Sequence, residues 1–190
     1  MLTFKKISLL LLSLLLVCSI QFAQANNDSQ KADYIYNFIQ YVEWSGIQSD
    51  SEVVIGVIGS TDVYSFLEQK TNSTDISQSV SVRSFNNIDD LLASNATPCH
   101  ILFISQNQDV SSPNLEELAR KSILLVGEKE GFAQHGGLIN FIETKTGSLK
   151  FEINQSKMIS YGFKVSPQLL RIAILAVPTT AASVANGSKP

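Results

Sequence analysis

The sequence predicts an α/β fold: a single three-layer domain with a mainly parallel central sheet, an antiparallel C-terminal hairpin and helices on both faces. Two observations predict this class. Short apolar runs typical of buried strands recur along the chain, and segments with helical patterning separate them, as crossovers between parallel strands require. In the C-terminal third, two runs with period-two alternation flank a turn that contains Gly147, which is typical of an antiparallel hairpin.

The chain opens with the features of a cleavable export signal. Two lysines precede an apolar run over residues 7–20, and Ala23 and Ala25 supply the small residues of a cleavage site. The run is shorter than the ~20 residues that a membrane-spanning helix needs. We therefore expect residues 1–25 to be a signal peptide that is cleaved after Ala25. We also expect export of the remainder and no direct membrane insertion of the mature chain.

Residues 31–44 have the spacing of an amphipathic helix. Apolar residues at i, i+3, i+4 and i+7 predict a stripe that packs on the sheet, formed by Ile35, Phe38, Ile39 and Val42. Tyr34 and Tyr41 lie one heptad apart on a neighbouring face, and Trp44 ends the segment. The helix thus carries more aromatic surface than one stripe requires. These three aromatic residues are candidate anchors for a partner, because interface hot spots favour Trp and Tyr.

Strands and helices alternate through the middle of the chain. The expected strands are residues 52–58, 80–85, 100–104 and 122–126, and the expected helices are residues 63–69, 87–94 and 113–121. Residues 70–78 are polar throughout and predict a loop. Pro113 is expected in the first turn of its helix, where its missing N–H costs nothing.

The C-terminal third breaks this alternation. It is expected to contain hairpin strands at residues 138–143 and 149–154 and helices at residues 155–161 and 168–175. In the second hairpin strand, Leu149, Phe151 and Ile153 alternate with polar residues and so share one face. We expect one α/β domain over residues 26–176. Residues 177–190 are small and polar and are expected to be disordered.

Charge and cysteine content exclude some classes of protein. Without the leader, 12 basic residues face 17 acidic ones, a net charge of about −5, and no Lys/Arg cluster stands out. Such a chain is a poor candidate for binding nucleic acid or an anionic membrane surface. Cys99 is the single cysteine after the leader, so no intrachain disulfide is expected. A bridge between two copies of Cys99 is conceivable, but the residue opens an apolar strand and fits a packed core position.

Catalytic patterns are missing from the sequence. Neither His100 nor His135 has a second ligand at metal-binding spacing, and the chain lacks both the GxSxG pattern of a nucleophilic serine and the Lys-Ser/Thr ending of a phosphate-binding loop. We therefore expect no catalytic residues, no metal, no cofactor and no enzymatic activity.

A small-ligand site is the alternative to a protein-binding surface. The segment GVIGS at residues 56–60 lies between an expected strand and an expected helix, where backbone amides can hold an anion. Gly59, Ser60 and Thr61 would line that crevice, with an anionic metabolite or nucleotide as ligand. The competing interpretation is that Ser60 or Thr61 caps the helix.

Six segments, taken in order, closely resemble the YfiR family. They are KADYIYNFIQYVEW at residues 31–44, GVIG at 56–59, CHILFIS at 99–105, GFAQHGGLINF at 131–141, LKFEIN at 149–154 and SPQLLRIA at 166–173. The resemblance implies a periplasmic α/β protein that binds the periplasmic domain of an inner-membrane diguanylate cyclase. It implies repression of that cyclase, and hence less cyclic di-GMP and less biofilm. Family members also form homodimers, so a homodimer is a further expectation.

The chain departs from the family pattern at two places. Ser45 follows Trp44, where the family usually has proline. Asn140 stands in the strand of the GG segment, and the paired cysteines that give relatives redox control are missing. Redox gating through an internal bridge is therefore not expected here.

The resemblance places the partner-binding surface on the FEIN strand and the turn after it. Carried over position by position, it implies Glu152, Met158 and Ile139 as binding residues. Alternation puts Glu152 on the face opposite Phe151, exposed on an outer strand. The competing interpretation is that Glu152 pairs with Lys150 on a solvated sheet edge. Met158 and Ile139 are of types found more often in a core.

Overall fold

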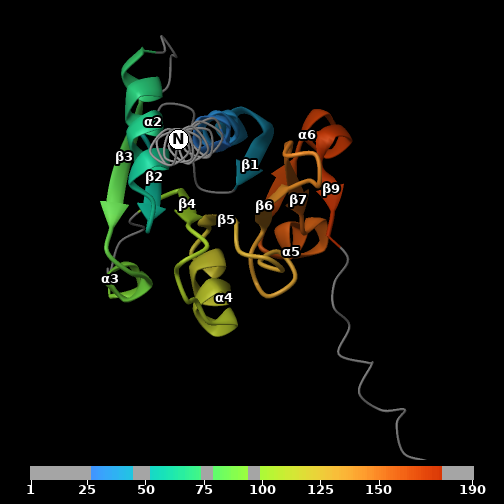
Figure 1. Cartoon of the computed structure of the whole chain (residues 1–190). Coiled ribbons are helices and arrows are strands. Elements are labelled where there is room, and N and C mark those ends of the chain that lie inside the picture. Colours follow the sequence, from blue (N-terminus) through green and yellow to red (C-terminus); the bar gives the residue numbers. More distant parts are fainter. Residues whose placement is uncertain (1–26, 45–51, 74–78, 94–98, 177–190) are drawn as a thin grey trace, which may run out of the picture.

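The computed structural model describes residues 27–44, 52–73, 79–93 and 99–176 (Figure 1). The expected signal peptide, the expected C-terminal tail and part of the expected loop at residues 70–78 lie outside this part of the chain. Within it, the chain forms three layers around a seven-stranded sheet, with a separate two-stranded sheet at one end. The predicted α/β class with a mainly parallel central sheet is confirmed.

The large sheet has the strand order β3-β2-β4-β5-β6-β7-β9. Its strands are β2 (Val53–Ile58), β3 (Val80–Phe85), β4 (Ile101–Ile104), β5 (Leu124–Gly127), β6 (Ile139–Glu143), β7 (Leu149–Ile153) and β9 (Ile174–Leu175). The strands from β2 to β6 pair in parallel, whereas β7 runs antiparallel to β6 and β9 runs parallel to β7. The predicted C-terminal hairpin is therefore present as β6 and β7.

Burial explains why the central strands are continuous apolar runs. Every residue of β2, β4 and β5 is buried, as expected for parallel strands covered on both faces. Strand β3 is only half-buried because it lies at the end of the strand order. The chain passes from β2 to β3 on one side and then returns to β4 on the other, which is the doubly wound arrangement.

Helices cover both faces of the sheet. The N-terminal helix (residues 27–41) and α2 (Thr61–Ser73) lie on one face, and α3 (Ile88–Leu92) and α4 (Ser112–Arg120) on the other, while α5 (Gln155–Ser160) and α6 (Pro167–Ile172) lie at the β7–β9 end (Figure 1). Pro113 is in the first turn of α4, as predicted. The N-cap Asn87 accepts a hydrogen bond from the Asp90 backbone N–H at 2.9 Å and so fixes the start of α3.

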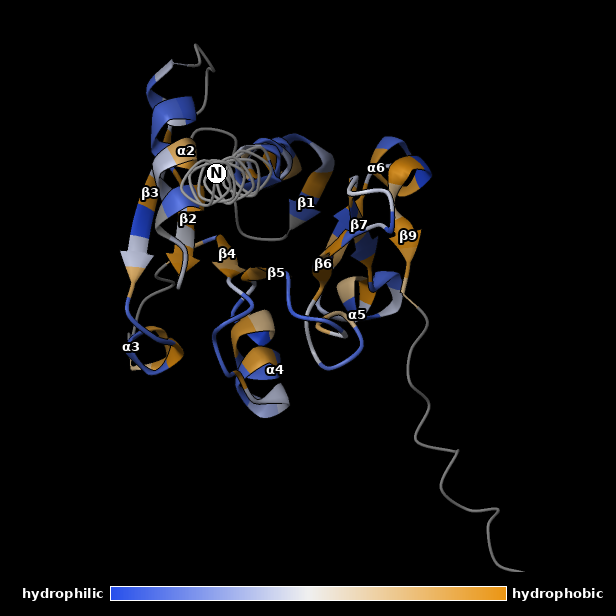
Figure 2. Ribbon diagram, viewed as in Figure 1, coloured by the Kyte–Doolittle hydropathy of each residue, from blue (hydrophilic) through white to orange (hydrophobic). Residues whose placement is uncertain are grey.

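The predicted stripe of the N-terminal helix packs on the sheet. Ile35 and Phe38 are fully buried, and the Phe38 ring lies 5.5 Å from that of Phe151 and 6.3 Å from that of Phe141. Burying each such side chain contributes about 1.5–3 kcal/mol, so this contact is a main part of the core. The hydropathy colouring in Figure 2 shows the apolar strands lying between the helical layers.

A small sheet joins the two ends of the domain and was not expected from the sequence. The N-terminal helix ends at residue 41, and β1 (Val42–Trp44) pairs antiparallel with β8 (Phe163–Val165). The expectation of a helix through residue 44 is wrong, because this pairing takes the last three residues into an extended conformation. The pairing fixes the end of the helix to the C-terminal segment.

Two more boundaries differ from the expected ones. Helix α2 runs to Ser73, four residues past the predicted end, and so includes the start of the expected loop. The expected helix at residues 168–175 ends at Ile172, and Ile174 and Leu175 form β9 instead. Because β9 pairs with β7, the FEIN strand is not the outermost strand of the sheet.

Candidate functional site: the C-terminal end of the sheet

Exposed apolar side chains gather at one end of the molecule. We call residues 144–176, which contain β7, α5, β8, α6 and β9, the C-terminal end. Figure 1 shows it in orange and red, opposite β3. The exposed fractions here are 64% for Ile159, 57% for Ile172, 43% for Ile174 and 55% for Leu175. Figure 2 shows the apolar colouring on α6 and β9. Grouped exposed apolar residues are typical of a protein-binding surface.

A hollow in this end lies between α5 and β8. Its volume is about 420 Å³, and its lining consists of Gln155, Ile159, Gly162, Phe163, Lys164 and Val165. Ile159 and Lys164 are exposed there, whereas Phe163 is buried. The hollow is large enough to take a side chain from another molecule.

Glu152 faces the loop that precedes β6. The side chain is half-buried, and one carboxylate oxygen accepts a hydrogen bond from Nε2 of Gln134 at 3.3 Å. Directly across the β6–β7 pair stands Asn140, and β9 places Ile174 on the other side. The expectation that Glu152 is exposed on an outer strand is therefore wrong, because both a loop and another strand adjoin it. Within the described residues, Glu152 forms no ion pair with Lys150.

Asn154, two residues after Glu152, binds the same loop. Its Nδ2 donates to the backbone oxygen of Ala133 at 2.7 Å, and its Oδ1 accepts from the backbone N–H of Lys157 at 3.1 Å. The residue thus caps α5 and holds the loop at once. These bonds hold the GFAQHGG segment against the FEIN segment.

Glycines allow the loop to close onto the sheet. A Cβ atom at Gly127 would lie 2.6 Å from the Phe132 ring, and one at Gly137 would lie 2.2 Å from it. Both distances are too short for any side chain. Phe132 therefore fills the space that two glycines leave open, and it anchors the loop that Glu152 and Asn154 bind.

Asn140 is the polar residue beneath this loop. It is fully buried, and neither Nδ2 nor Oδ1 has a hydrogen-bond partner among the described residues; the same holds for Oε1 of Gln134. Because a buried amide without partners costs about 1–3 kcal/mol, the polar side chains facing Glu152 are not there for stability alone.

The other residues expected to bind a partner differ in their burial. Met158 and Ile139 are fully buried, so neither side chain presents surface in this conformation. Tyr34 is half-buried, and its ring lies 5.2 Å from that of Phe151. Tyr41 is exposed, and its backbone oxygen accepts a hydrogen bond from the Ser166 N–H, next to the C-terminal end. The side chain of Trp44 lies outside the described residues.

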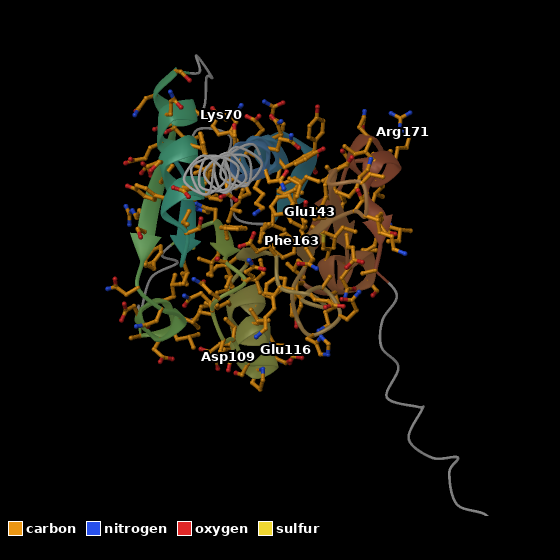
Figure 3. The ribbon with its side chains drawn as sticks, viewed as in Figure 1. Lys70, Asp109, Glu116, Glu143, Phe163 and Arg171 are labelled. Carbon is orange, nitrogen blue, oxygen red and sulfur yellow. The ribbon has the colours of Figure 1, made fainter. Side chains whose placement is uncertain are left out.

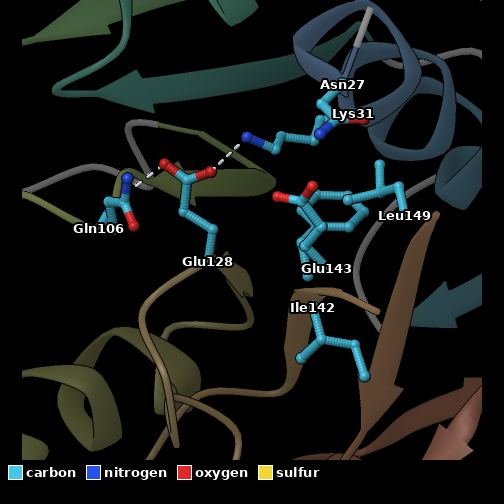
Figure 4. Close-up of a pocket in the computed structure, with 8 residues that line it drawn as sticks. Asn27, Lys31, Gln106, Glu128, Ile142, Glu143 and Leu149 are labelled. Carbon is cyan, nitrogen blue, oxygen red and sulfur yellow. Dashed lines mark hydrogen bonds and ion pairs between the residues drawn. The ribbon is translucent and has the colours of Figure 1, made fainter. Parts of the chain in front are cut away.

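A buried ion network lies at the other end of the β6–β7 strand pair, near Glu143 and Leu149. Lys31 Nζ lies 2.7 Å from Asp28 and 2.5 Å from Glu128, and all three side chains are at most 12% exposed. Figure 4 shows the contact between Lys31 and Glu128. Burial lowers the pKa of Lys31, but the hydrogen bonds and charges of the two carboxylates outweigh it, so its pKa stands above the ordinary value. No sequence pattern predicts this network, because Glu128 is far from the helix in the sequence.

Glu128 links this network to the loop after β4. Its Oε1 accepts from the Ser105 hydroxyl at 3.0 Å and from the Gln106 N–H at 3.1 Å. Beside it lies a hollow of about 110 Å³, lined by Asn27, Lys31, Gln106, Glu128, Phe141, Ile142, Glu143 and Leu149 (Figure 4). Since Lys31 is already paired with two carboxylates, its main effect is to fix the N-terminal helix to the carboxyl ends of β4 and β5.

The expected ligand crevice takes a different form. Gly59 follows β2 with a φ of +81°, and a Cβ atom there would lie 2.7 Å from the Gln108 side chain. Ser60 accepts a hydrogen bond from the Val63 N–H at 3.3 Å, so it serves the helix as a cap. The side chain of Thr61 lies outside the described residues. Neither hollow described above includes these three positions.

The cysteine and one histidine are held in unreactive forms. Cys99 is fully buried, and burial raises the pKa of its thiol to about 12. Nδ1 of His100 accepts a hydrogen bond from the Val54 N–H at 2.9 Å, and burial lowers the pKa of the ring despite the charge of Glu52. Among the residues that the structure describes, no group of three or more His, Cys, Asp or Glu side chains is placed to hold a metal ion.

The fold is an α/β domain with exposed apolar residues beside one edge of its sheet. The chain belongs to the YfiR/HmsC-like family, whose model matches residues 28–174. No characterised protein matches the chain significantly. In the described part of the chain, no helix has the length and apolarity that crossing a membrane requires.

Proposed function

We propose that this protein is a periplasmic regulator that binds the periplasmic domain of an inner-membrane diguanylate cyclase and represses it. Membership of the YfiR/HmsC-like family supports the class of target. The observation that carries the proposal in this chain is the exposed apolar surface of the C-terminal end, next to Glu152. Binding there would hold the cyclase in its inactive state and lower cyclic di-GMP and biofilm formation.

We assign different tasks to the expected binding residues on the basis of their burial and contacts. Tyr41 and the exposed apolar residues of the C-terminal end would contact the partner. Glu152 would act on the surface through the loop that it holds by Gln134. Met158 and Ile139 would support the surface from the core. The expected homodimer stays a prediction, and it would use a face other than this one.

Affinity purification tests the proposal directly. Residues 26–190 serve as bait for detergent-solubilised inner membrane, and cyclic di-GMP is measured in parallel in a strain that lacks the gene. The expected result is recovery of a protein with a diguanylate cyclase domain, together with raised cyclic di-GMP in the deletion strain. Recovery of no cyclase, with unchanged cyclic di-GMP, would contradict the proposal.

A further inference from the structure

We propose that the C-terminal end is a basic, apolar surface whose partner is a protein that presents carboxylates around an apolar centre. This inference rests on the proposed function for the identity of that partner, and it adds the chemistry of the contact. The inference follows from the distribution of charged residues between the C-terminal end and the rest of the chain.

The charges of the chain are strongly segregated. Residues 144–176 contain five basic residues and one acidic residue, whereas residues 26–143 contain six basic and sixteen acidic residues. A protein with an overall negative charge therefore has one end with a positive excess. Complementary charge steers association and selects partners more than it adds to affinity.

The basic residues of this end are not neutralised internally. They are Lys145, Lys150, Lys157, Lys164 and Arg171. All except the half-buried Lys157 are exposed, and among the described residues none of the five forms an ion pair with a carboxylate. Figure 3 shows Arg171 pointing away from the body of the molecule at α6. In contrast, five of the six basic residues of residues 26–143 form ion pairs.

The acidic residues near this end do not cancel the excess. Glu152 turns toward Gln134 and Asn140 and is half-buried, so its charge is partly withdrawn from the surface. Glu43 stands across the β1–β8 pair from Lys164, and Glu143 begins the hairpin turn. Glu116 lies near Tyr161 of this end, together with its ion-pair partner Arg120. Counting these neighbours, six cations still face four carboxylates.

Exposed apolar residues are present at the same end of the molecule. Ile172, Ile174 and Leu175 are about half-exposed in consecutive parts of α6 and β9. In the described part of the sheet, β9 is the last strand of the order, so its outer edge has no neighbouring strand. An apolar centre with a charged rim is the usual anatomy of a protein interface.

The charge distribution favours a different protein as the partner over a second copy of this chain or an anionic membrane. A two-fold dimer through this end would bring five cations against the same five, which is repulsive. An anionic membrane would attract the cations, but it would repel the sixteen acidic residues of residues 26–143. A bilayer interior would also leave the edge groups of β9 without hydrogen bonds. An acidic protein surface meets none of these objections.

Site-specific crosslinking in cells tests the inference. A photoreactive p-benzoylphenylalanine replaces Ile174 at the C-terminal end or, as a control, the exposed Arg83 of β3 at the opposite edge of the sheet. The crosslinked peptide is sequenced by mass spectrometry. We expect a crosslink at position 174 to a protein segment rich in Asp and Glu, and none to that segment from position 83.

Charge reversal provides the second arm. Lys150→Glu with Arg171→Glu should reduce the crosslink at position 174 at least tenfold, whereas the matched reversal Arg83→Glu should change it less than twofold. Thermal unfolding verifies that each variant folds; Lys164→Glu replaces the double variant if that one does not. A crosslink to lipid, to a second copy or to a basic segment would overturn the inference, as would an unchanged or absent crosslink. If the acidic segment belongs to a protein other than a cyclase, the proposed function fails while this inference stands.

Discussion

The carboxylate of Glu152 accepts a hydrogen bond from Nε2 of Gln134 at 3.3 Å, and this bond connects the FEIN strand to the loop before β6. Asn154 holds the same loop at Ala133, and Phe132 anchors it between two glycines. Glu152 is thus placed to shape the surface beside β9 as well as to charge it. This distinction can be measured.

Replacing Glu152 separates its two roles. Glu152→Lys removes the acceptor for Gln134 and should release the cyclase, which raises cyclic di-GMP to the level of the deletion strain. Glu152→Gln keeps an acceptor oxygen and should repress normally, because the hydrogen bond matters here rather than the charge. If the Gln variant releases the cyclase as fully as the Lys variant, the carboxylate contacts the partner directly and the positioning role is wrong.

The Lys31 network predicts a large loss of stability on removal of its cation. Lys31→Met removes the Lys31 charge from the buried carboxylates of Asp28 and Glu128, and breaking a buried ion pair from one side typically costs about 3–5 kcal/mol. Lys129→Met is the matched control, since its partner Asp109 is fully exposed and such pairs contribute at most about 1 kcal/mol. Urea unfolding of both variants gives the comparison. Equal losses would show that the Lys31 network is not a main support of the fold.

Burial of Cys99 predicts an unreactive thiol. With its pKa raised to about 12, the thiol stays protonated up to pH 9 and is shielded from reagents. Folded residues 26–190 should not react with a thiol-specific dye over minutes, and one thiol should react after denaturation in guanidinium. Rapid labelling of the native protein, or a disulfide-linked dimer under mild oxidation, would contradict the core position of Cys99.

His100 predicts a stability that falls in acid. Because burial lowers its pKa in the folded state, the unfolded chain binds the extra proton first as pH decreases. The stabilisation is present above the unfolded pKa of about 6.5 and is lost as pH falls through that value toward the folded pKa. Protonation would also break the bond that Nδ1 accepts from the Val54 N–H.

A matched variant isolates this effect. His100→Asn offers an acceptor oxygen near the position of Nδ1 but does not titrate. Between pH 7.5 and 5.5, the free energy of unfolding should fall more for the natural protein than for the variant. Parallel losses in both would assign the acid sensitivity to other groups.

Much of the fold could be predicted from the sequence. The buried strands β2, β4 and β5 are continuous apolar runs, and the apolar residues of the N-terminal helix follow the helical period. These two patterns were enough to predict the elements. β1, β8 and β9 have only two or three residues each, too few to show a period of two. They depend on pairing between distant segments, which no local pattern contains.

The candidate site was less predictable for the same reason. Family resemblance indicated Glu152, but its partner Gln134 is 18 residues away and is brought there by the loop and the β6–β7 register. Residues 174 and 175 were expected at the end of a helix, so the sequence did not predict an exposed apolar strand there. The charge excess of residues 144–176 was present in the sequence, but it becomes a surface only once the fold gathers these elements at one end.

The most direct test of the account measures cyclic di-GMP in a deletion strain that carries one of three versions of the gene. The natural protein and Ser84→Asp, a change on the exposed far edge of the sheet, should both restore low cyclic di-GMP. Ile174→Asp should not, although it is exported at the same level, because it places a carboxylate at the apolar centre of the C-terminal end. Full repression by Ile174→Asp, or no effect of the deletion itself, would contradict the claim that this end binds and represses a diguanylate cyclase.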